Sequence, residues 1–123
     1  FDERKGVRWA ITLRDDDRLI GTVGFHFWLK EHHRCDLGYD LIPAYWGRGY
    51  VTEVSRAVIG WCFTNLELHR VQADCTSGNI ASERVLEKLG FTLEGEFRES
   101  IFEHGRFVNI KQYGLLRREF LGK

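Results

Sequence analysis

The feature that most constrains this fold is a glycine-bracketed connection between a strand-like and a helix-like segment. Residues 43–50 read Pro-Ala-Tyr-Trp-Gly-Arg-Gly-Tyr; strand-like residues 35–42 precede them and helix-like residues 51–65 follow. Two glycines at such a turn let backbone N–H groups approach an anion closely, and the helix N-terminus adds partial positive charge. The connection therefore predicts a site for a phosphate-bearing ligand.

The periodicity of the apolar residues predicts the remaining elements. Alternation predicts strands at residues 7–13, 19–29, 35–42, 68–75, 91–99 and 107–116. Spacings of three and four predict helices at residues 51–65 and 80–89, the second capped by Asn79 and Gly90. Polar connections are expected at residues 14–18, 30–34 and 104–106, and a polar tail at 117–123. The order β-β-β-α-β-α-β-β, with hairpins at both ends, predicts an α/β fold with a mixed sheet.

Each predicted helix has an apolar face that is expected to pack on the sheet. These faces consist of Val51, Val54, Val58 and Trp61 in the first helix, and Ala81, Val85 and Leu89 in the second.

Composition excludes several functional classes. The 123 residues suit one domain, with 18 basic and 18 acidic side chains, so bulk electrostatic binding of nucleic acid or an anionic membrane is not expected. No apolar run approaches the roughly 20 residues of a membrane span. Three cysteines without CxxC spacing favour a cytoplasmic setting over a disulfide framework, and the five scattered histidines predict no metal site.

Four further motifs occur in a fixed order around this connection. They are Leu37-Gly38-Tyr39 before Trp46–Tyr50 and Glu53, Leu68-His69-Arg70-Val71 before Asn79 and Ser82, Val85-Leu86-Glu87-Lys88-Leu89-Gly90-Phe91, and Gly105 followed by Tyr113-x-Leu115-Leu116. Together they resemble the GNAT superfamily of acyl-CoA-dependent N-acetyltransferases, and most of all its RimJ/RimL-like branch. Ala44 departs from the resemblance, because the family's cofactor loop usually begins with Gln or Arg.

The resemblance implies a single GNAT-like domain over residues 1–123 that lacks the family's N-terminal strand and two helices, which normally build much of the acceptor pocket. It also implies acetyl-CoA as cosubstrate and no metal. The implied cofactor-binding residues are Leu41, Ile42, Trp46, Gly47, Arg48, Gly49, Tyr50, Val51, Asn79 and Ser82. Tyr45 and Trp46 have core packing as an alternative role, and Asn79 has helix capping.

The resemblance implies catalytic roles as well. Asp36 or Asp40 would take the proton of the acceptor ammonium, with Asp36 slightly preferred, and a solvated strand edge is the alternative for both. Ser82 would protonate the departing thiolate, and its alternative is a small residue in a helical turn. Tyr113 is a second candidate acid, with a cross-strand core position as its alternative. A backbone N–H near Leu41 or Ile42 would stabilise the carbonyl oxygen.

The expected function is thus acetyl transfer from acetyl-CoA to a primary amine by direct attack in a ternary complex. No cysteine neighbours a base in the sequence, which disfavours an acyl-enzyme. A protein N-terminus, a polyamine or an amino-sugar amine remains open as acceptor, and a monomer or a homodimer as assembly. The alternative function is a non-catalytic acyl-CoA-binding sensor or interaction module on the same fold.

Overall fold

The computed structural model describes residues 7–13, 16–42 and 45–122. Ala44, where the cofactor-loop pattern is broken, lies outside the described residues, as does part of the turn expected at 14–18. The elements run in the order β1 (Val7–Leu13), β2 (Asp16–Leu29), η1 (Lys30–His32), β3 (Arg34–Leu41), α1 (Tyr50–Asn65), β4 (Arg70–Thr76), α2 (Ile80–Lys88), β5 (Thr92–Glu103), β6 (Arg106–Leu116) and α3 (Arg117–Phe120). The predicted α/β order is confirmed.

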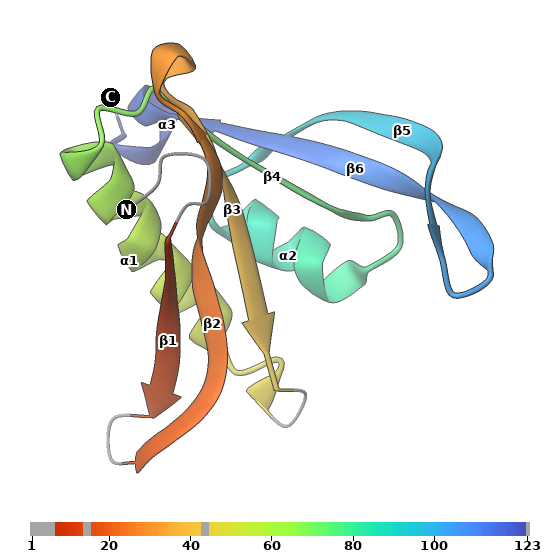
Figure 1. Ribbon diagram of the computed structural model, residues 1–123, viewed down its shortest axis with the longest axis horizontal. Helices are drawn as coiled ribbons and strands as arrows, with labels where there is room; N and C mark the ends of the chain where they lie inside the picture. Colours follow the sequence, from red (N-terminus) through yellow and green to blue (C-terminus); the bar gives the residue numbers. More distant parts are fainter. Residues whose placement is uncertain (1–6, 14–15, 43–44, 123) are drawn as a thin grey trace.

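The described strands form one sheet in the order β1-β2-β3-β4-β6-β5. Every neighbouring pair is antiparallel except β3 and β4, which run parallel. This parallel pairing covers only Arg34–Asp36 against Arg70–Gln72, after which the two strands separate. Figure 1 shows β3 running downward and away from β4, which runs to the right beside β6 of the long β5–β6 hairpin. The sheet is therefore open in the middle, beside the connections that lead into α1 and α2.

One hydrophobic cluster joins α1 and α2 to alternate residues of the central strands. Val23, Cys35, Val71 and Leu115 are among its strand members, each at most 1% exposed, so both helices cover the same face of the sheet. All three cysteines are buried and free. A hydrogen bond with Cys62, together with burial, raises the pKa of the Cys35 thiol, which therefore stays protonated inside the core.

Two helix residues that the periodicity placed in the core are exposed. Trp61 is 43% exposed and meets Trp9 edge to face at 5.5 Å between ring centroids, so it covers the rim of the core. Ala81 is exposed, while Leu86 takes the fully buried position in α2. The buried face of a short helix can differ by one position from the face that the sequence predicts, because the largest apolar side chains decide which face packs on the sheet.

The polar tail and one polar turn differ from expectation. Residues 117–120 form α3, because Glu119 Oε1 accepts from the Leu116 N–H at 2.9 Å and Phe120 packs on Phe63. Strand β2 begins at Asp16, so the turn expected at 14–18 is shorter than predicted. Residues 16–18 belong to the strand because β2 pairs with β1 in a hairpin, and charged side chains are compatible with a strand near the edge of a sheet.

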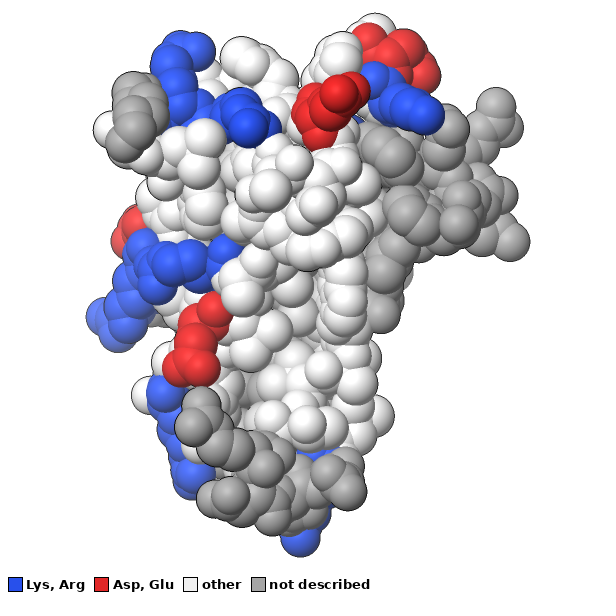
Figure 2. All heavy atoms as spheres, turned by 90° about the vertical axis from the view of Figure 1, so that its left-hand side faces the viewer, with Lys and Arg blue, Asp and Glu red and all other residues white. Residues whose placement is uncertain are grey.

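Charged groups do not form a field of one sign on the face in Figure 2. Basic and acidic side chains lie around the edges of a largely neutral centre. This agrees with the balance of 18 basic and 18 acidic residues. No helix within the described ranges combines the length and apolarity that crossing a bilayer requires.

Candidate active site between β3 and β4

The glycine-bracketed connection has the backbone geometry that its sequence predicts. Gly47 and Gly49 have φ values of 76° and 81°, in the left-handed region that glycine adopts without strain. Gly49 is the N-cap of α1, and its carbonyl accepts the first helical bond from Glu53 at 3.0 Å. A Cβ at either glycine would meet no protein atom within 4 Å. Both glycines and the first residues of α1, Tyr50, Val51 and Thr52, line a cavity. The first amides of a helix have no acceptor within the helix, so they are available to a ligand in that cavity.

A first cavity of about 500 Å³ lies between this connection, β3 and α2. Eight of the expected cofactor residues line it: Leu41, Trp46, Gly47, Gly49, Tyr50, Val51, Asn79 and Ser82. Ile42 and Arg48 do not line it. The Arg48 guanidinium lies 5.4 Å from the centroid of the Tyr45 ring, which holds it over that ring.

Two cations that the sequence analysis missed, Arg84 and Lys88, also line the first cavity. They are four residues apart on α2, so they share a helix face, and that spacing is the signal that could have revealed them. Together with the N-terminus of α1 they make the first cavity suited to an anionic ligand.

A second cavity of about 440 Å³ lies along the other flank of the same gap. Asp36, Asp74 and Glu103 line it, and none of its described lining residues is Lys or Arg. Asp36 and Asp74 alternate with buried core residues, so they belong to the sheet face that the helices leave uncovered. Asp40, the other candidate base, lines the first cavity instead.

The two cavities share Tyr39, Asn79 and Ser82. Asn79 Oδ1 accepts from the Ser82 N–H at 3.3 Å, which confirms Asn79 as the N-cap of α2. The Ser82 side chain hydrogen-bonds to Tyr39; burial raises the pKa of the Tyr39 phenol, and this bond opposes part of the rise. Tyr39 was missed as a site residue, although it ends the Leu37-Gly38-Tyr39 motif.

The backbone of β3 also faces the gap. The Ile42 N–H donates to the carbonyl of Ile20 on β2 at 2.8 Å, so Ile42 and Ile20 form a hydrogen-bonded antiparallel pair. Antiparallel pairs alternate, so Leu41 and Tyr39 direct their backbone groups away from β2 and toward the gap. The Leu41 carbonyl accordingly accepts from Trp46 Nε1 at 2.8 Å. Two backbone N–H groups were expected near the reacting carbonyl. That of Ile42 already donates to Ile20, and that of Leu41 points into the gap.

Tyr113 lies outside both cavities. It is 2% exposed, pairs with Ala73 on β4 and Leu93 on β5, and belongs to the hydrophobic core. Burial raises the pKa of its phenol. Its position is that of a cross-strand core aromatic, which corrects its candidacy as an acid at the site.

The described residues contain no group of three or more His, Cys, Asp or Glu side chains arranged to hold a metal ion. The donors that do converge on the first cavity are backbone amides and basic side chains. Groups of this kind bind phosphate.

A strand, a glycine-bracketed loop and a helix that meet beside the split of a mixed sheet are typical of proteins that bind a phosphate-bearing ligand. The family model described as the acetyltransferase (GNAT) domain matches residues 1–92. The uncharacterized N-acetyltransferase YoaA of Bacillus subtilis is 37% identical over 117 residues, covering 95% of this chain and 66% of the relative. The putative ribosomal N-acetyltransferase YdaF of Bacillus subtilis is 32% identical over 108 residues, covering 88% and 59%.

The chain therefore belongs to the GNAT family of acetyltransferases. The crystal structure of a probable acetyltransferase matches with a TM-score of 0.87 at 29% identity, covering 94% of this chain and 63% of that one. The match to a solved member of the same fold agrees with the confirmed element order. The chain spans less than two thirds of the length of these relatives, between 59% and 66%.

Proposed function

We propose that this chain carries the catalytic part of an N-acetyltransferase that moves the acetyl group of acetyl-CoA to a primary amine. The observation that carries the proposal is the meeting of two cavities of unlike charge at Tyr39, Asn79 and Ser82. One cavity offers amides and cations to a phosphate-bearing donor. The other offers carboxylates to an ammonium acceptor. A transfer reaction needs this arrangement, because donor and acceptor must meet at one point.

The donor would lie in the first cavity. Its pyrophosphate would accept from the amides around Gly47, Gly49 and Tyr50, with Arg84 and Lys88 balancing the negative charge. Its acyl arm would run along β3, where the backbone of Leu41 faces the gap. The Leu41 N–H is then the natural donor to the thioester carbonyl as negative charge develops on that oxygen.

Asp36 is the proposed base. It lines the acidic cavity from which the amine would arrive, whereas Asp40 lines the donor cavity, and this supports the choice between them. The acceptor ammonium loses one proton to Asp36, the resulting amine nitrogen forms a bond to the carbonyl carbon, and the carbon–sulfur bond breaks. The nitrogen sheds a second proton as it becomes the amide, which replaces the proton that Ser82 gives to the thiolate. Ser82 then donates a proton to the leaving thiolate, and its hydrogen bond with Tyr39 would help to orient that donor.

The acceptor is proposed to carry positive charge. Asp36, Asp74 and Glu103 line its cavity, and three carboxylates attract a cation electrostatically. The names of two relatives point to amine acceptors of different kinds. YdaF is named a putative ribosomal acetyltransferase, which supports placement near the RimJ/RimL-like branch, and a spermidine N(1)-acetyltransferase of Escherichia coli is 25% identical over 92 residues. A primary amine next to a further cationic group fits the acidic cavity best.

The test has two arms. In the first, acetyl-CoA and a panel of amines and basic peptides are mixed with the protein, and free CoA is measured with a thiol reagent. Turnover with at least one amine is expected, and Asp36→Asn should slow it much more than Asp40→Asn. In the second, acetyl-CoA should raise the Tm, and Gly49→Trp should remove that rise.

These two arms separate the enzyme from a non-catalytic sensor on the same fold. Binding of acetyl-CoA without turnover over the whole panel would favour the sensor. Absence of a Tm shift at millimolar acetyl-CoA would contradict both.

A further inference from the structure

The turn that joins β4 to α2 is held by an unusual bond. Of the three amides at Ser77, Gly78 and Asn79, the first and the last donate to backbone carbonyls. The Gly78 N–H instead donates to Glu83 Oε2 at 2.9 Å. Gly78 has a φ of 92°, so the turn depends on a left-handed residue that a side chain fixes in place.

The other oxygen of that carboxylate reaches across to the sheet. Glu83 Oε1 accepts from Lys111 Nζ on β6 at 3.0 Å, and the two side chains are only 13% and 21% exposed. The Gly78 amide and the Lys111 ammonium hold the pKa of Glu83 below its ordinary value, and Glu83 raises the pKa of Lys111. Both groups therefore stay charged near neutral pH, and the bridge is shielded from water more than a surface ion pair is.

The bridge encloses the residues at the junction of the cavities. Gly78 immediately precedes Asn79, and Glu83 immediately follows Ser82, so the Gly78–Glu83 bond closes a ring around both. Lys111 then ties this ring to β6, opposite Cys75 at the end of β4. No other described side chain bonds to the Gly78 amide.

We propose that Glu83 and Lys111 are positioning residues that hold Asn79 and Ser82 in register with Tyr39. The inference rests on the proposed function and adds to it two residues that touch neither reactant. Loss of the bridge leaves the Gly78 amide without its acceptor and lets the turn move. A small displacement at a reacting centre lowers the rate strongly. The groups proposed to bind the pyrophosphate, at Gly47, Gly49, Arg84 and Lys88, lie outside the turn, so acetyl-CoA affinity should change less.

The experiment compares Glu83→Ala, Lys111→Met and Lys111→Arg in the purified protein. Both kcat with the best amine and Kd for acetyl-CoA are measured. Glu83→Ala and Lys111→Met should lower kcat by roughly 10- to 100-fold while Kd changes less than about twofold. Lys111→Arg should recover most of the rate because it keeps the ion pair. Glu87→Ala, which removes an exposed acid one turn further along α2, is the matched control and should change neither value.

A second readout keeps the inference separate from the proposed function. Hydrogen exchange at the Gly78, Asn79 and Ser82 amides should accelerate in Glu83→Ala and not in Glu87→Ala. Wild-type protein that turns over no amine, combined with this acceleration, would refute the enzyme and leave the positioning of the turn supported. An unchanged kcat in Glu83→Ala, equal losses of rate and acetyl-CoA affinity, or unchanged exchange would each overturn the inference.

Discussion

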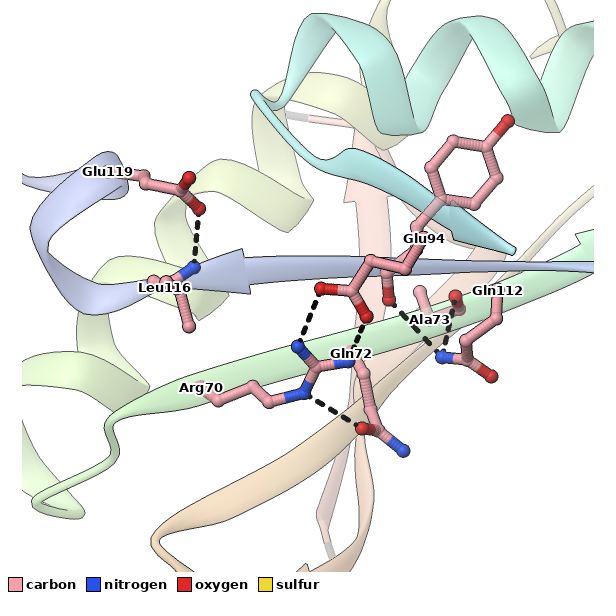
Figure 3. Close-up of polar contacts among 8 residues, drawn as sticks. Arg70, Gln72, Ala73, Glu94, Gln112, Leu116 and Glu119 are labelled. Carbon is pink, nitrogen blue, oxygen red and sulfur yellow. Dashed lines mark hydrogen bonds and ion pairs between the residues drawn. The ribbon is translucent and has the colours of Figure 1, made fainter.

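Arg70 on β4 and Glu94 on β5 form a two-pronged ion pair that crosses over β6, the strand between them. Arg70 Nη1 and Nη2 donate to the two carboxylate oxygens of Glu94 at 2.8 and 2.6 Å, and Arg70 Nε donates to Gln72 Oε1 at 3.0 Å (Figure 3). The pair lies over Gly114 of β6, where a Cβ would collide with both charged groups. A glycine in the middle of a strand thus makes room for a clamp across three strands.

The clamp predicts a pH dependence of stability. Arg70 holds the pKa of Glu94 below its ordinary value near 4.5. A lowered folded-state pKa means that the pair stabilises the protein above the unfolded-state pKa and that this contribution is lost as the pH falls through the folded-state pKa. Glu94→Gln should therefore lower the Tm modestly above about pH 5.5, and the difference from wild type should shrink toward pH 3.

Gly114→Ala provides a related check in thermal melts between pH 3 and 7. Its methyl group should displace the ion pair and reproduce the lost pH dependence. A difference between Glu94→Gln and wild type that grows as the pH falls would contradict the assignment.

Gly21 on β2 predicts a large steric effect. A Cβ there would collide with the backbone carbonyl of Asp40 on β3, and backbone cannot swing aside as a side chain can. Gly21→Ala should cost about 1–3 kcal/mol in free energy of unfolding, measured by urea titration. The matched control is Gly60→Ala inside α1, where the nearest contact would be 3.6 Å to Phe120. That change should stabilise by about 0.5–1 kcal/mol, since alanine favours helix. Equal effects at both positions would refute the close approach of β2 and β3.

The basic residues on α2 predict how acetyl-CoA binding responds to salt. Arg84→Gln and Lys88→Gln should each raise the Kd about three- to tenfold at low salt and weaken its salt dependence, because each removes one cation from the donor cavity. Titration calorimetry at two ionic strengths measures both quantities. Arg118→Gln, an exposed change on α3, should leave the Kd unaltered. If all three variants respond alike, long-range charge and not contact is responsible.

The position of Tyr39 between the two cavities predicts that a change at its hydroxyl alters kcat and leaves the Kd for acetyl-CoA nearly unchanged. Tyr39→Phe keeps the ring that lines both cavities but removes the hydroxyl that bonds to Ser82. We expect kcat to fall roughly tenfold, as for loss of one positioned hydrogen bond, with little change in acetyl-CoA affinity. Tyr45→Phe removes a phenol that lines the donor cavity alone and should preserve kcat. Steady-state kinetics with the best amine decides this, and an unaltered rate in Tyr39→Phe would exclude the phenol from the transfer step.

Local features of this fold could be predicted from the sequence, whereas features that depend on distant strands could not. The left-handed angle at Gly90 and the cap at Asn79 follow from neighbouring residues, and both are found. Alternation places Asp36 on one face of β3, but it cannot reveal that β4 leaves β3 at that residue and opens a cavity there.

The same limit applies to the helices and to the hairpin. Arg84 belongs to the donor cavity because α2 is rotated to bury Leu86, and this rotation depends on the sheet beneath. Tyr113 matches a motif position, but its environment is decided by strands on both sides of β6. Packing between elements far apart in sequence is decided by volume and register, which a single sequence leaves open.

The short contact between β3 and β4, limited to three residue pairs, leaves two strand edges that face each other inside the molecule. An exposed edge normally invites a strand of another chain and so promotes aggregation. Here the helices cover one side of the opening, and each edge already has a sheet behind it. A narrow, flexible molecule can enter where a whole strand with its own sheet cannot. With the proposed function, the fold would keep hydrogen-bonding backbone available to the acyl arm of the donor while withholding it from strands of other chains.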